Sequence, residues 1–117
     1  MEHFEIVIVE NGNITVFTVK GYFEEKAGKE LAKEADRYLQ QGRFILIIDF
    51  AECLVISSPG IAALIDLALL VIDDYKGRVI LSGLDRLKTS VLSMSGVIPL
   101  AEVAPSIEDA LKRLSEG

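Results

Sequence analysis

The sequence has few of the residues on which most catalytic and metal sites depend. It contains one cysteine, Cys53, one histidine, His3, and no tryptophan. A single cysteine excludes an intramolecular disulfide and a cysteine-rich metal site, and a zinc site needs several more nitrogen or sulfur ligands than these. A Ser-His-Asp triad would have to take its histidine from the extreme N-terminus, and no phosphate-binding glycine loop or dinucleotide motif is present. We therefore expect no enzyme, no catalytic residues, no metal and no cofactor.

Positive charge is also scarce, since 12 Lys and Arg against 18 Asp and Glu give a net charge of -6. A nucleic-acid partner requires clustered cations and is not expected, whereas a basic protein surface would suit this charge. The longest apolar stretch, from Pro59 to Ile72, is interrupted by Asp66 and is shorter than the roughly 20 residues of a membrane span. The acidic N-terminus does not resemble a secretory signal. We expect a cytoplasmic protein without a membrane partner.

The apolar residues that remain alternate between strand-like and helix-like patterns. Strands are expected at 4–9, 14–19, 44–50, 78–82 and 100–103, and helices at 24–40, 58–76, 84–94 and 106–114. Asn11-Gly12-Asn13 predicts a hairpin turn, and Gly21 is expected to end the second strand. The unbroken apolar run at 44–50 is typical of a central strand covered on both faces. The order predicts an α/β fold, a mixed sheet of four to five strands flanked by about four helices, in one domain spanning 1–117.

The most informative site is the corner Ser57-Ser58-Pro59-Gly60, which precedes a very apolar helix. Proline fits the first helical position, so Ser58 is the expected N-cap, and Gly60 keeps the first turn open to a close partner. Two interpretations stay open. Ser58 is a structural cap and nothing more, or it also receives a phosphate, which the positive helix end and its unsatisfied N–H groups would accommodate.

Several segments together resemble the STAS-domain anti-sigma factor antagonists of bacterial partner-switching systems. Their order and spacing carry the resemblance, which runs over nearly the whole chain and implies the STAS fold. The segments are Gly21-Tyr22-Phe23-Glu24, Ile47-Ile48-Asp49-Phe50, Ile56 to Leu64, Val79-Ile80-Leu81-Ser82-Gly83-Leu84, Met94-Ser95-Gly96-Val97 and Ser106 to Leu111.

The resemblance implies a protein that binds an anti-sigma factor that is also a serine kinase, and thereby releases a sigma factor. Phosphorylation by that kinase would abolish binding, and a serine phosphatase would restore it. The implied phosphoacceptor is Ser58, with Ser57 as the fallback. The implied partner-binding residues are Glu24, Ser57, Ser58, Pro59, Gly60 and Ile61.

Two residues depart from the family pattern, because Ser57 stands where aspartate is usual and Pro59 where a small hydroxyl residue is usual. An alternative function therefore stays open, a ligand-sensing or scaffold STAS domain without phosphorylation. The other polar residues are interpreted as structural. Asp49 is expected to be exposed or hydrogen-bonded at a strand end, Cys53 to fill apolar space, and Asp66 to face solvent or to be capped. Glu24 is equally well explained as an acid favoured at a helix start.

Overall fold

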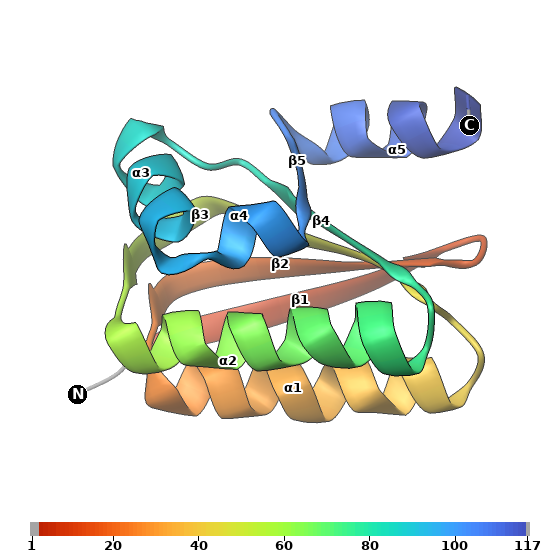
Figure 1. Cartoon of the computed structure of the whole chain (residues 1–117), viewed down its shortest axis with the longest axis horizontal. Coiled ribbons are helices and arrows are strands. Elements are labelled where there is room, and N and C mark those ends of the chain that lie inside the picture. The colour runs from red at the N-terminus through yellow and green to blue at the C-terminus, as the bar shows by residue number, and fades with distance from the viewer. Residues whose placement is uncertain (1–2, 117) are drawn as a thin grey trace.

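The computed structural model describes residues 3–116, which form one five-stranded sheet with helices on both faces (Figure 1). The strands lie side by side in chain order, β1-β2-β3-β4-β5. The elements are β1 (Phe4–Asn11), β2 (Ile14–Phe23), α1 (Glu25–Gln40), β3 (Ile45–Ile56), α2 (Ser58–Leu69), a π-helical turn η1 (Leu70–Asp74), β4 (Arg78–Ser82), α3 (Arg86–Ser95), α4 (Val97–Leu100), β5 (Glu102–Ala104) and α5 (Ile107–Glu116).

The sheet is mixed, as the sequence predicts. β1 and β2 form an antiparallel hairpin that Asn11 and Ile14 close, and each later strand runs parallel to its predecessor. The prediction that Gly21 ends β2 is wrong, because the strand continues to Phe23. Gly21 has φ +82 and lies beside a register shift, and an added Cβ there would meet the backbone of His3. The glycine therefore marks an irregularity inside the strand.

The central strand β3 is longer than expected, since the prediction ended it at Phe50 and it reaches Ile56. It pairs with β2 along its whole length, up to Ile56 opposite Phe23, but with β4 only as far as Asp49 opposite Ser82. The last residues of β3 thus extend past β4 with a strand on one side only, within the chain that the structure describes. Several of these last residues are exposed, so they do not continue the unbroken apolar run from which the strand was predicted.

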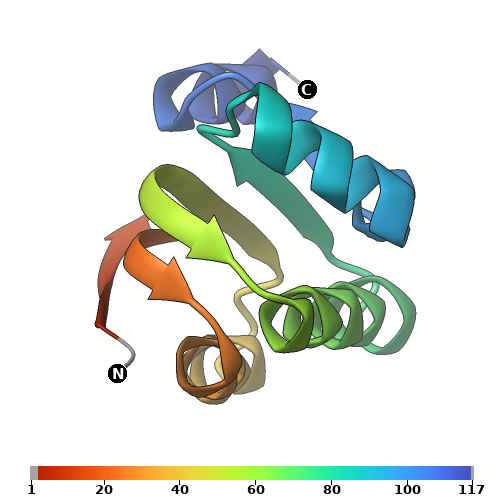
Figure 2. The same cartoon turned by 90° about the vertical axis from the view of Figure 1, so that its left-hand side faces the viewer.

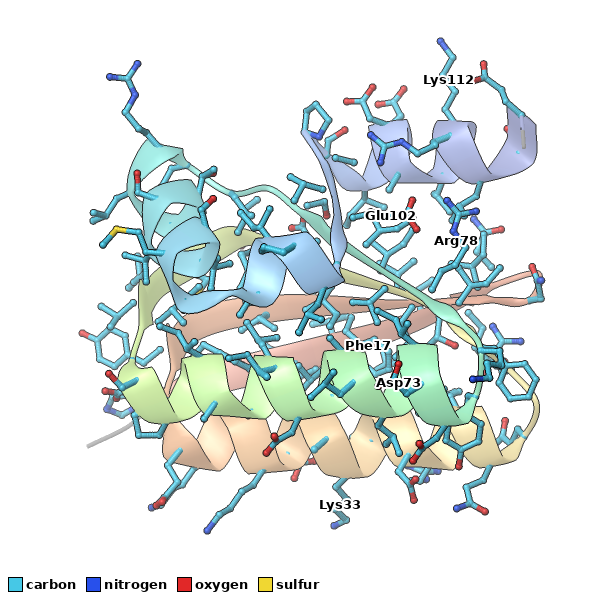
Figure 3. The ribbon with its side chains drawn as sticks, in the orientation of Figure 1. Phe17, Lys33, Asp73, Arg78, Glu102 and Lys112 are labelled. Carbon is cyan, nitrogen blue, oxygen red and sulfur yellow. The ribbon has the colours of Figure 1, made fainter. Side chains whose placement is uncertain are left out.

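The main core lies between the sheet and the helices α1 to α4. Phe17, Phe23 and Phe50 are completely buried there, and the rings of Phe23 and Phe50 meet edge to face with centroids 5.6 Å apart. Figure 3 shows Phe17 between the sheet and the helix pair α1 and α2. Removing such a side chain from water contributes roughly 1.5–3 kcal/mol to stability. This core anchors the elements that carry the site.

A smaller apolar cluster lies on the opposite face, under α5, and contains Val16, Ile47, Ile80 and Ala110. Figure 2 shows the sheet nearly end-on, with α1 and α2 on one side and the C-terminal helix on the other. This arrangement explains the unbroken apolar run of β3, because alternate residues of that strand enter the two clusters.

Three smaller predictions about elements need correction. The helix expected at 84–94 begins at Arg86, because the Asp85 carboxylate caps it by accepting from the Lys88 N–H at 2.8 Å. The expected strand at 100–103 is Glu102–Ala104, and Val97–Leu100 forms a short helix instead. The helix expected at 58–76 is α2 followed by the π-helical turn η1.

Candidate functional site

The corner that joins β3 to α2 differs from the prediction in one residue. Ser57, rather than Ser58, is the N-cap, with an extended backbone (φ -91, ψ 170) and a side-chain oxygen that accepts from the Gly60 N–H at 3.4 Å. Ser58 is the first residue of α2 and Pro59 the second. Proline is tolerated at either place because first-turn N–H groups have no partner within the helix. Pro59 therefore did not identify the cap.

The two serines differ in exposure as well as in position. Ser57 is half-buried, and its N–H donates to the Phe23 carbonyl at 3.1 Å, which ties the corner to the end of β2. Ser58 and Pro59 are exposed. Ile61, one turn further, is partly buried against the main core. The corner thus presents the Ser58 side chain at the surface of a helix whose start is held by β2.

Gly60 is buried, and a Cβ added to it would meet the backbone and, at 2.9 Å, the ring of Phe23. The space beside this glycine is therefore occupied by the protein's own strand β2. Gly28 and Ala63 make a similar close approach between α1 and α2, where an added Cβ would come within 2.7 Å of the Ala63 side chain. Glycine at position 60 lets α2 start directly against β2, which places Ser58.

An acidic hollow lies on one side of the corner. It is lined by Glu24, Glu25, Ser57 and Pro59. Glu24 is the N-cap residue of α1, but within the described chain its side chain accepts no capping hydrogen bond, and Glu25 is the acid in the first turn. The lining of this hollow contains two carboxylates and no cation. A partner that contacts it is therefore favoured if it brings a basic group.

An apolar groove lies on the other side of the corner, and the sequence did not predict it. We call it the β3–α3 groove. It has a volume of about 190 Å³, and its lining comes from the end of β3 and from α3: Leu54, Val55, Ile56, Asp85, Leu87, Lys88 and Val91. Leu54 is 69% exposed and Leu87 is 74% exposed. Leu87 and Val91 are four residues apart in α3 and so share one helix face, but this spacing does not tell whether the face is buried.

Charges at the rim of the β3–α3 groove are matched within the protein. The Lys88 amine donates to the Asp85 carboxylate at 2.8 Å, and this hydrogen bond, with the one from the Lys88 backbone, lowers the pKa of Asp85. Met94, 88% exposed, lies on the same helix α3. A groove with paired charges and exposed apolar side chains suits an apolar side chain of a partner.

The remaining polar residues have structural surroundings. Asp49 is buried rather than exposed, and its carboxylate accepts from the Ser82 hydroxyl at 2.7 Å and from the Ala51 N–H at 3.1 Å. The hydrogen bonding expected of Asp49 is confirmed. Cys53 is buried, as expected of a filler, and burial raises the pKa of its thiol. Asp66 faces solvent, as predicted.

Two further features of residues 3–116 concern other functions. No group of three or more His, Cys, Asp or Glu side chains in this part of the chain could hold a metal ion. In the same residues, no helix is both long and apolar enough to cross a membrane.

No family model and no curated protein matches the sequence. Solved structures match it closely in fold. The Bacillus protein SpoIIAA, an anti-sigma factor antagonist, was solved in its phosphorylated form; it is 19% identical, with 96% of this chain and 99% of that chain covered and a TM-score of 0.71. A serine-to-glutamate variant of RsbS from Moorella thermoacetica is 15% identical, with 95% of each chain covered and a TM-score of 0.82.

The chain has the STAS fold. A sulfate transporter family protein from Wolinella succinogenes shares it at 21% identity, with 93% of each chain covered and a TM-score of 0.77. Identities this low establish the fold alone, and STAS domains evidently occur in proteins with different tasks. Function therefore has to be argued from the corner and its surroundings.

Proposed function

We propose that this STAS domain is an anti-sigma factor antagonist. It binds a kinase-type anti-sigma factor through the surface around Ser58, and thereby releases a sigma factor in the cytoplasm. Phosphorylation of Ser58 by that partner ends binding, and a serine phosphatase restores it. The observation that supports this most is the position of Ser58, exposed in the first turn of α2 between an acidic hollow and an apolar groove.

The choice of Ser58 over Ser57 rests on geometry. The Ser57 oxygen already caps α2, and that residue is half-buried, whereas the Ser58 side chain is exposed. A phosphate on Ser58 would lie on an exposed side chain at the positive end of α2, so the fold can carry it. The fallback acceptor, Ser57, would have to give up its cap.

The capping role of Ser57 also accounts for one departure from the family pattern. Aspartate and serine are both preferred N-caps, because each offers an oxygen to the first-turn N–H groups. Ser57 keeps this function without the negative charge. Pro59 fits the second helical position without loss of a needed donor. Neither departure prevents the corner from forming.

The surroundings of Ser58 explain how a phosphate would act on binding. A partner that covers Ser58 also covers the β3–α3 groove on one side and Glu24 with Glu25 on the other. A dianion in such a contact would lose its water, and the cation of the groove, Lys88, is already paired with Asp85, so the loss is costly. The dianion would also lie near two carboxylates of the protein itself, which raises the electrostatic cost of covering it with a partner that fits the unmodified corner.

The test measures affinity for the cognate anti-sigma factor by titration calorimetry, with phosphorylation followed by mass spectrometry. Ser58→Ala should bind like wild type and resist phosphorylation, and Ser58→Asp should bind at least about 10-fold more weakly. Asn13→Asp adds the same charge in the hairpin turn, at the opposite end of the molecule, and should bind like wild type. Equal affinity of all variants, or phosphate transfer to Ser58→Ala, would contradict the proposal.

A second candidate function is that of a ligand-sensing or scaffold STAS domain. The same fold occurs in a sulfate transporter family protein, which supports this candidate. It predicts no phosphorylation by a kinase-type anti-sigma factor. It also predicts that a small molecule raises the melting temperature of the purified protein. Phosphate incorporation at Ser58 would rule in favour of the first candidate.

A further inference from the structure

The strand β1 forms one edge of the sheet. It pairs with β2 through an uninterrupted antiparallel register from Phe4 opposite Gly21 to Asn11 opposite Ile14. Figure 2 shows no described element beyond β1 on its outer side. Sheet edges of this kind are usually shielded by lysine, proline or a bulge. The segment Phe4–Asn11 contains neither residue, its register has no shift, and its only charged side chains are Glu5 and Glu10 near its two ends.

The hydrogen-bond pattern shows which backbone groups of β1 face outward. The Tyr22 N–H donates to the His3 carbonyl at 2.8 Å, so these two residues are a hydrogen-bonded pair. In an antiparallel ladder such pairs alternate, and residues 5, 7 and 9 therefore also bond to β2. The residues between them direct their N–H and C=O groups away from the sheet: Phe4, Ile6, Ile8 and Glu10. Four residues thus offer donors and acceptors at the open edge.

The side chains of β1 are apolar on both faces near its middle. Ile6 and Ile8 pack against the main core, so Val7 and Val9 lie on the opposite face. Val9 is 54% exposed. The two glutamates, Glu5 and Glu10, flank this apolar centre. A strand with this pattern is suited to pair with another apolar strand.

We propose that β1 pairs with β1 of a second copy of this chain, antiparallel, about a two-fold axis at Val7. In this register Ile6 lies opposite Ile8 of the second copy, and Phe4 opposite its Glu10. These pairs use all four outward-facing residues. An axis at Ile8 would leave Phe4 without a partner, because it would face the hairpin turn. An axis at Glu5 or Glu10 would oppose identical carboxylates, which is unfavourable.

The seam continues the sheet from five strands to ten and uses neither Ser57 nor Ser58. It is independent of the proposed function. The interface is small, so it belongs to the weak class, and the dimer should form only at about 10 µM and above.

Sedimentation equilibrium over a range of concentrations tests the seam. Val7→Lys would place two like-charged lysines directly opposite each other, with Cβ atoms about 5 Å apart across the axis, and should weaken the dimer at least about 10-fold. Thr18→Lys is the matched control, because Thr18 faces Val7 on β2 and its side chain lies on the same face. Its two copies would be about 15 Å apart, beyond the screening length, and it should dimerise like wild type. Thermal melts followed by circular dichroism should show both variants folded.

A residue-specific measurement keeps the proposal falsifiable if Val7→Lys lowers stability. Amide signals of wild-type protein are followed by NMR during dilution. The amides of Ile6 and Ile8 should shift and gain exchange protection at high concentration, whereas those of Val7 and Val9, already bonded to β2, should change little. A wild-type monomer at about 1 mM would overturn the proposal, and so would equal weakening by Val7→Lys and Thr18→Lys.

Discussion

The two ends of the sheet differ in how their side chains are partnered. At one end a charged side chain is hydrogen-bonded within the protein, and at the other end apolar side chains are left exposed. At the hairpin end Arg43 ties the segment before β3 to the β1–β2 hairpin, since its guanidinium donates to the Gly12 carbonyl at 2.7 Å, the Ile14 carbonyl at 2.6 Å and the Thr15 hydroxyl at 3.0 Å. At the other end, where α2 begins, Leu87 and Met94 are mostly exposed. Figure 1 shows the hairpin and the start of α2 at opposite ends of the long axis.

This contrast separates stability from recognition. The hairpin end satisfies the polar groups around Arg43 from within, and its aromatic rings Phe44, 39% exposed, and Tyr75 contact each other with centroids 5.6 Å apart. The end with Ser58 leaves apolar area uncovered, which monomeric proteins seldom do without a partner. Substitutions at the first end should therefore affect folding, and substitutions at the second should affect binding.

Arg43→Ala should have the largest effect on stability. It leaves two backbone carbonyls and a hydroxyl without their donor, and hydrogen bonds of charged groups contribute about 1.5–3 kcal/mol. We expect the free energy of unfolding to fall by about 2–3 kcal/mol, measured by urea denaturation. Arg43→Lys keeps the charge but not the planar fork, and should recover less than half of the loss. If the proposed anti-sigma partner bound the folded variant more weakly, the division between the two ends would fail.

Leu87→Ser should have the next largest effect, on binding alone. The leucine lines the β3–α3 groove and is 74% exposed, so little of its area is buried by folding. Loss of its contact with the partner should weaken affinity about 10-fold. Titration of the anti-sigma factor measures this, with melting temperature as the check on folding.

Leu69→Ser is the control for Leu87→Ser. Leu69 is also an exposed leucine, 39% accessible, but it lies at the C-terminal end of α2, away from Ser58. It should bind the partner like wild type. Equal weakening by both substitutions would mean that general surface hydrophobicity, and not the groove, determines affinity.

Glu102→Gln should have the smallest effect, and only on the pH dependence of stability. Two hydrogen bonds from Arg78, at 2.6 and 2.8 Å, lower the pKa of the Glu102 carboxyl (Figure 3). A carboxyl with a lowered folded-state pKa stabilises the fold above its unfolded value, 4.5, and loses that contribution as pH falls through the lower folded value. Both side chains are over one third exposed, so the contribution is about 0.2–1 kcal/mol.

Denaturation at pH 7 and at about pH 3 measures the difference for Glu102→Gln. Wild type should lose slightly more stability between these values than the variant does. An equal pH dependence would show that solvent already screens the Arg78–Glu102 pair completely.

The corner Ser57 to Gly60 shows which features of the candidate site could be predicted from sequence patterns. The residues Ser57 to Gly60 were predicted to start an apolar helix, and they do. The cap itself was misplaced by one residue, because proline is acceptable at both the first and the second helical position and so does not identify the cap. Local patterns also could not show that Gly60 faces Phe23, since that contact joins segments 37 residues apart.

Local order along the chain determined much of this protein by itself: the hairpin, the five strands, the mixed α/β sheet and the helix that starts near Ser58. These features depend on the spacing of apolar residues, on turn residues and on burial, and residues close together in the sequence are enough to indicate them. Only the tertiary structure decided that Leu54 and Leu87, distant in sequence, form one exposed groove and that β3 outlasts β4. The reason is physical, because the same apolar helix face reads identically in sequence whether another element covers it or leaves it exposed.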